Sequence, residues 1–179
     1  QDIEIFSTED LEVTRKKIMI TGREILRSNN KYITDYEDAI SAAAYFKEKE
    51  VDALFVPFVN YGQEEAVAKL AKEMGVPLLI WGPRDKIASP KDTYRQTDSQ
   101  CGIFAASKVL RRYGIKFTHI ENCEINHVIF EEGFNTFIET ARIVSAFKKR
   151  GRIAQISVRP QQFLNLMVNE GELLERFGI

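Results

Sequence analysis

Residues 52–58 read Asp52-Ala53-Leu54-Phe55-Val56-Pro57-Phe58, and after the aspartate the run contains no polar residue. A strand with one face in solvent alternates apolar and polar residues, whereas a strand covered on both faces has no need to. Ala53–Phe58 is therefore predicted to be a central strand of a parallel sheet.

Similar runs alternate with helical patterns along the rest of the chain. Further strands are expected at Ile3–Ser7, Leu78–Gly82, Phe117–Glu121 and Arg152–Ser157. Residues 8–33 fit either a short strand at Lys16–Thr21 or an extended arm. The order βαβαβαβαβα, with right-handed crossovers, predicts an α/β fold: a three-layer αβα doubly wound parallel sheet (Rossmann/flavodoxin-like) of about five strands.

Helix start signals lie between these runs. The segments Thr34-Asp35-Tyr36-Glu37 and Thr97-Asp98-Ser99-Gln100 fit capping boxes, in which a hydroxyl and an acid or amide three residues later satisfy free N–H groups. Phe130–Lys149 has the apolar spacing of a long amphipathic helix. Asn169 can cap a short helix that ends at Phe177.

Glycine follows a predicted helix four times, where a left-handed residue is expected. Gly75, Gly114 and Gly151 each lead into a predicted strand, whereas Gly178 is followed by Ile179 alone. This repeated pattern leads us to expect that residues 1–179 are a single α/β domain and the N-terminal fragment of a longer, multi-domain protein. Much of the chemistry is then expected outside the chain.

Composition limits the classes of partner. The formal net charge of −1 leaves no basic face for nucleic acid, and no apolar run approaches the length of a membrane-spanning helix. Cys101 and Cys123 form no CxxC motif, which favours a reducing cytoplasm over a disulfide scaffold. We therefore expect a cytoplasmic protein that binds neither nucleic acid nor membrane.

Ligands of open parallel sheets collect at the carboxyl ends of the strands. Asn60 and Tyr61 follow the strand at 53–58, and Arg159 follows the run at 152–157. The Arg159 guanidinium can fork onto a carboxylate, a phosphate or vicinal hydroxyls, or form a structural salt bridge. Tyr61 and Trp81 suit either a sugar face or the core, and Asn60 either contacts a ligand or caps its helix.

Several common site signatures are missing from the sequence. It contains no GxGxxG after the first strand, no Walker loop and no GxSxG elbow. His119, Cys123 and His127 recur at a spacing of four, which would align three metal ligands on one helix. Because His119 falls in a predicted strand, the three are expected to diverge. No catalytic residue and no metal site is assigned to this chain.

Four collinear segments resemble the N-terminal region of the L-fucose/L-arabinose isomerase-like proteins. They are residues 52–64, residues 95–102 followed by Tyr113-Gly114-Ile115, Arg159-Pro160-Gln161-Gln162-Phe163, and residues 172–179. The resemblance implies an aldose–ketose isomerase that works through a cis-enediol, with Mn²⁺ polarising the substrate oxygens and carboxylates moving the proton.

In such proteins the metal ligands lie in later domains, so the resemblance implies that Mn²⁺ binds outside this chain and that residues 1–179 alone are inactive. It also implies that the domain supports a homo-oligomer and closes over the sugar pocket of a neighbouring subunit. By position, Asn60, Tyr61 and Arg159 would contact the sugar. A non-catalytic sugar-binding or sensing α/β module, or a homologue that has lost catalysis, remains as an alternative.

Overall fold

A computed structural model describes residues 33–86 and 97–179. The chain divides into two compact units, the first ending at Phe137 and the second running from Ile138 to Ile179. The strand expected at Ile3–Ser7, and the strand or arm expected at Lys16–Thr21, lie outside the described residues.

The first unit is built on a parallel sheet with the strand order β1-β2-β3. Its strands are β1 (Leu54–Pro57), β2 (Leu78–Trp81) and β3 (Thr118–His119). Leu54 pairs with Leu78, and Ile80 pairs with His119. Three predicted strands are thereby confirmed, although β3 is shorter than the sequence suggests.

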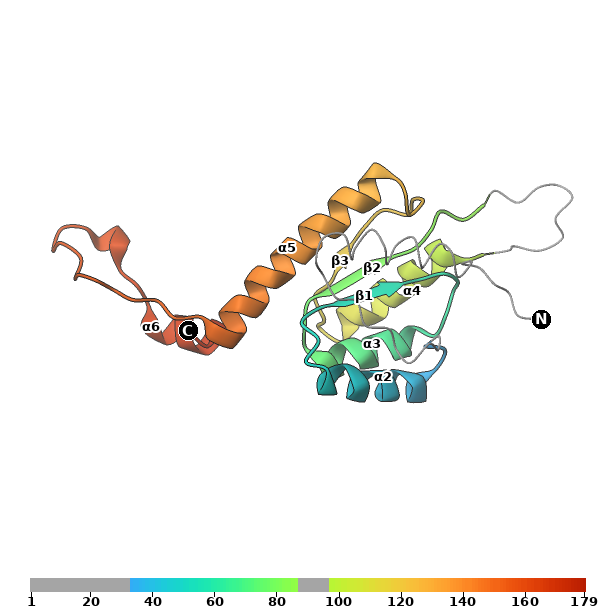
Figure 1. The fold of residues 1–179 in the computed structure, drawn as a ribbon, viewed down its shortest axis with the longest axis horizontal. Helices are drawn as coiled ribbons and strands as arrows, with labels where there is room; N and C mark the ends of the chain where they lie inside the picture. Colours follow the sequence, from blue (N-terminus) through green and yellow to red (C-terminus); the bar gives the residue numbers. More distant parts are fainter. Residues whose placement is uncertain (1–32, 87–96) are drawn as a thin grey trace, which may run out of the picture. The chain divides into compact units, whose positions relative to one another are not determined.

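Three helices pack side by side on one face of this sheet (Figure 1). They are α2 (Tyr36–Glu48), α3 (Glu64–Met74) and α4 (Ser99–Arg112). Alternate strand residues Leu54, Leu78 and Ile80 point into this layer and join one buried apolar cluster with Leu70 and Leu110. Since α3 and α4 connect successive parallel strands, they are the crossover helices of two βαβ units.

The other face of the sheet is covered by the start of α5 (Val128–Arg150). The Phe130 ring lies 4.7 Å from the Trp81 ring, and the Phe134 ring lies 5.3 Å from the Phe55 ring, centroid to centroid. Helices therefore cover both faces, as a three-layer αβα fold requires. The part of the chain that the structure describes holds three strands, where about five were expected.

The cap of α2 differs from the predicted one by a residue. Asp35, rather than Thr34, precedes the helix, and its carboxylate accepts from the Asp38 N–H at 2.9 Å. The Asp38 carboxylate reaches back to the Thr34 N–H at 3.1 Å and to the Thr34 hydroxyl at 2.8 Å. The two carboxylates thus satisfy N–H groups on both sides of the helix start, which is the logic of a capping box.

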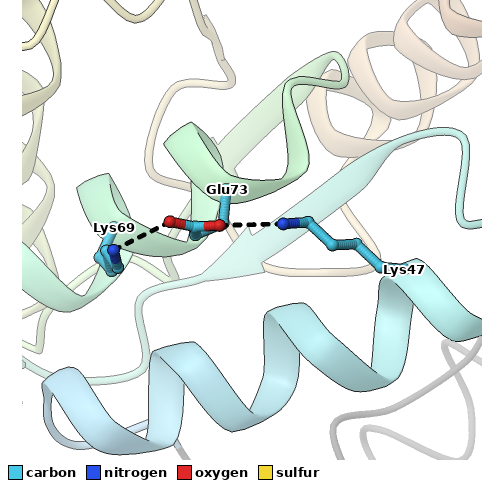
Figure 2. A network of polar contacts seen from close by, with 3 residues as sticks. All are labelled: Lys47, Lys69 and Glu73. Carbon is cyan, nitrogen blue, oxygen red and sulfur yellow. Dashed lines mark hydrogen bonds and ion pairs between the residues drawn. The ribbon is translucent and has the colours of Figure 1, made fainter.

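A charged network joins α2 to α3 (Figure 2). Glu73 on α3 lies between two ammonium groups, that of Lys47 on α2 at 2.9 Å and that of Lys69 one turn earlier on α3 at 2.9 Å. These two partners lower the pKa of Glu73 to about 2, because hydrogen bonds from both lysines favour its ionised form.

The second unit contains the rest of α5, a 3₁₀ turn at Leu164–Leu166 and α6 (Glu170–Phe177). As predicted, the Asn169 side chain caps α6, accepting from the Glu172 N–H at 3.0 Å. The strand predicted at Arg152–Ser157 is not formed in this chain, where these residues have no regular structure. The described unit offers no strand with which they could pair.

The glycine pattern is confirmed at three of four positions. Gly75, Gly114 and Gly178 adopt left-handed backbone with φ between 60° and 69°. Gly151 does not. Glycine is instead required at this position by close packing, since a Cβ on residue 151 would lie 2.6 Å from the Phe147 carbonyl oxygen.

Candidate loop cluster at the carboxyl edge of the sheet

Asn60 joins the loop after β1 to the start of α4. Its side-chain oxygen accepts from the Tyr61 N–H at 2.9 Å and from the Asp98 N–H at 3.2 Å. Asn60 does not cap α3, whose N-terminal neighbour is Gln63. The amide oxygen therefore fixes the loop that carries Tyr61, and one of the two sequence interpretations of Asn60 is corrected.

Tyr61 presents a polar group at this edge. Tyr61 is 39% exposed, and its hydroxyl donates to a Glu64 carboxylate oxygen at 2.7 Å. This bond raises the pKa of Tyr61 and lowers the pKa of Glu64. At neutral pH the pair is accordingly a neutral phenol beside an ionised carboxylate. Since the phenol hydrogen is used within the pair, the remaining lone pairs of both groups can accept hydrogen bonds from the hydroxyls of a ligand.

The N-terminus of α4 is held from a distance by Asp85, which lies in the loop after β2. Its two carboxylate oxygens accept from the N–H groups of Ser99 and Gln100, each at 2.9 Å. Asp98 precedes the helix but makes no side-chain cap, so the predicted capping box at Thr97 is not what caps α4. A carboxylate at a helix N-terminus is favoured by the helix dipole as well as by these bonds.

Two glycines allow the loops to pack closely around α4. A Cβ on Gly102 would lie 2.5 Å from the Tyr61 carbonyl oxygen, and one on Gly82 would lie 2.7 Å from the Phe58 carbonyl oxygen. Ser99 is fully buried, and a Cβ on Gly82 would also lie 3.1 Å from the Ser99 Cβ. Larger residues at 82 or 102 would push the β1 and β2 loops away from the helix.

The loop after β3 belongs to the same edge. The Asn122 side chain donates to the Pro83 carbonyl oxygen at 3.2 Å. The loops that follow all three strands and the start of α4 are thus tied together, since the Asn60 and Asp85 side chains accept from N–H groups at the start of α4 and Asn122 donates to the loop after β2. We call this group of loops, residues 58–64, 82–85, 98–102 and 120–123, the loop cluster.

The chain matches the model of a known protein family. The family model described as fucose/sulfoquinovose isomerase, N-terminal domain, matches residues 4–148. The chain belongs to this family. The match spans the sheet of the first unit and the whole loop cluster, and it confirms the resemblance to an N-terminal domain of fucose isomerase-like proteins. Searches of curated proteins and of solved structures gave no match.

The three predicted sugar contacts of this isomerase-family chain do not all lie in the matched domain. Asn60 and Tyr61 are neighbours in the loop cluster, whereas Arg159 lies in the second unit, beyond the matched residues. Arg159 follows no strand, and its guanidinium donates to the Gln161 carbonyl oxygen at 3.1 Å. Trp81 is 1% exposed among aromatic rings, so it belongs to the core and not to a sugar face.

Sequence reasoning missed the tertiary roles of Asp85, Ser99 and Gly102. The only sequence signal for Asp85 was its position after a predicted strand, at the edge where ligands collect. Nothing in the sequence pairs it with a helix that starts fourteen residues later.

No group of three or more His, Cys, Asp or Glu side chains within residues 33–86 and 97–179 is arranged to hold a metal ion. His119 lies on β3, Cys123 is buried, and the ring of His127 accepts from the Ile129 N–H at 3.2 Å. None of the described helices is long and apolar enough to cross a membrane.

Proposed function

We propose that this chain is the N-terminal domain of a cytoplasmic, metal-dependent aldose–ketose isomerase that acts on a sugar of the fucose, arabinose or sulfoquinovose type. The observation that carries the proposal is the family match over residues 4–148. This match favours an isomerase over the alternative of a non-catalytic sugar-sensing module.

The role proposed for the domain is to line the sugar pocket and to support a homo-oligomer. In the pocket, Tyr61 and Glu64 would bind sugar hydroxyls, and Asn60 would hold the Tyr61 backbone in place. The exposure of Tyr61 and the ionised state of Glu64 support this role. Arg159 is proposed as a further contact on the ground of its charge and planar fork alone.

The residues described here do not fit a Mn²⁺ site, since they contain no cluster of three ligands. The metal is therefore proposed to bind in another part of the full-length isomerase. When bound, it would polarise the carbonyl and hydroxyl oxygens of the sugar. The chain itself would bind and orient the sugar and would carry out no proton transfer.

The experiment compares residues 1–179 with the full-length protein. Each is incubated with L-fucose, L-arabinose and sulfoquinovose, with and without Mn²⁺, and ketose formation is followed. We expect turnover by the full-length protein only, lost on chelation and restored by Mn²⁺. Turnover by residues 1–179 alone would contradict the proposal, and so would a full-length protein that binds a sugar without converting it.

A further inference from the structure

The run Arg152–Val158 carries aliphatic side chains that lie in solvent. Ile153 is 63% exposed, Ile156 99% and Val158 84%. Large apolar side chains that are exposed together along one short run mark a place where another part of a protein packs. The run is also rich in branched residues, which are enriched in strands.

The backbone of this run is not paired with another described segment, and its Ser157 and Val158 carbonyl oxygens accept hydrogen bonds from the Gln155 and Ser157 side chains. Within the described parts of the chain, residues 152–158 make no backbone–backbone hydrogen bond with one another or with any other residue. Exposed apolar side chains on a backbone without inter-strand hydrogen bonds are what a strand presents before it joins a sheet, because the sheet buries the side chains and supplies those bonds.

The chain after this run returns to the point where the run begins. Residues 152–158 lead away from Gly151, and α6 is followed by Ile179, whose N–H donates to the Leu173 carbonyl oxygen at 3.4 Å. A Cβ on Gly151 would lie 2.7 Å from Cγ1 of Ile179. In a parallel βαβ unit the crossover helix brings the chain back to the start of the first strand in this way.

We propose that residues 152–158 are the first strand of a second parallel sheet, that α6 is its crossover helix, and that the stretch of the isomerase following residue 179 supplies the neighbouring strand. The occupant is argued from the family match, which ends at residue 148 and describes an N-terminal domain. On this proposal residues 152–179 begin the next domain, in place of the single domain expected over residues 1–179.

This proposal does not rest on catalytic activity, and hydrogen–deuterium exchange tests it directly. Exchange of the amides of residues 153–158 is measured in the 1–179 chain and in the full-length protein. We expect rates close to those of a free peptide in the 1–179 chain and rates about 100-fold slower, or more, in the full-length protein. Equal and fast exchange in both would overturn the proposal. Protection that grows with the concentration of the 1–179 chain would also overturn it, since the partner would then be a second copy.

A pair of variants adds a second readout. Ile156→Asp is expected to lower the Tm of the full-length protein and to leave that of the 1–179 chain unchanged, because Ile156 is exposed in the latter. Gln162→Asp, at an exposed polar position in the same unit, is the control and should change neither. An Ile156→Asp variant that is silent in both proteins, or that destabilises both equally, would contradict the proposal. If the full-length variant fails to fold, the exchange measurement on the unsubstituted protein decides.

Discussion

Gly102 on α4 lies directly against the backbone of Tyr61, so close that a Cβ at residue 102 would stand 2.5 Å from the Tyr61 carbonyl oxygen and 2.9 Å from its Cα. Both neighbours are backbone atoms, which cannot rotate away as a side chain does. Gly102→Ala should therefore displace the loop that carries Asn60 and Tyr61. Overpacking of this kind costs ~1–3 kcal/mol of unfolding free energy, to be measured by urea titration.

Gly171→Ala is the matched control for this prediction. The nearest neighbour of a Cβ there would be the Asn169 side-chain oxygen, at an ordinary contact distance of 3.4 Å. Gly171 lies inside α6, where alanine is the better helix former by ~1 kcal/mol. Gly171→Ala is expected to be neutral or slightly stabilising. Equal losses of unfolding free energy for the two variants would contradict the close contact between residue 102 and the Tyr61 backbone.

Asp85 anchors the start of α4 through two hydrogen bonds to backbone N–H groups. Asp85→Ala should destabilise the fold by ~1–3 kcal/mol, because it leaves two N–H groups at the helix N-terminus without their acceptor. Asp85→Asn keeps one acceptor oxygen and should lose less. Thermal unfolding of both variants checks the order. An asparagine variant as unstable as the alanine variant would indicate that charge, rather than hydrogen bonding, holds the helix.

The contact between α5 and the sheet predicts a contrast between two phenylalanines. Phe130 is buried against Trp81, whereas Phe104 on α4 is 76% exposed. Phe130→Ala should cost ~3–5 kcal/mol through the cavity it leaves. Phe104→Ala should change stability by about 0.5 kcal/mol or less. Trp81 is the sole tryptophan, so its fluorescence reports unfolding of this layer. A mild Phe130→Ala variant would contradict the described packing of α5.

The Lys47–Glu73–Lys69 network predicts a pH dependence. The folded pKa of Glu73, about 2, lies below its ordinary value of 4.5. A lowered folded pKa stabilises the fold above the unfolded pKa, and this contribution is lost as the pH falls from about 4.5 toward 2. Glu73→Gln should weaken the dependence of the unfolding free energy on pH between about 4.5 and 2. Glu124→Gln, at an exposed loop position, is the control. Parallel curves for Glu73→Gln and the unsubstituted chain would contradict the network.

The sequence predicts the sheet of the first unit because its strands are short runs of apolar residues. Such a composition is typical of strands that are buried on both faces. Leu54–Pro57 and Leu78–Trp81 fall within a residue or two of their predicted bounds. The same reasoning fails at Arg152–Ser157. Composition indicates that a run can be a strand, but only a neighbouring strand makes it one, and none of the described residues supplies it.

The loop cluster shows the same limit. Asn60 and Tyr61 could be selected from their position after a predicted strand, since ligands collect at that edge. The contacts of Asp85 with Ser99 and of Gly102 with Tyr61 could not be predicted from the sequence. Each joins segments that are brought together only when the crossover helix packs on the sheet. Local signals around Thr97 favoured a cap that the tertiary contact from Asp85 replaces.

The central claim is that Tyr61, held by Asn60 in the loop cluster, contributes to the sugar pocket of the isomerase. The measurement that tests it most directly is kcat/KM of the full-length protein carrying Tyr61→Ala, with Tyr113→Ala as control. Tyr113 is also an exposed tyrosine, but it lies at the opposite end of α4. We predict that Tyr61→Ala lowers kcat/KM by about tenfold or more, equivalent to ~1.4 kcal/mol, mainly through KM and with an unchanged Tm. Tyr113→Ala should retain the parent value. A Tyr61→Ala enzyme with the kcat/KM of the parent would contradict the claim.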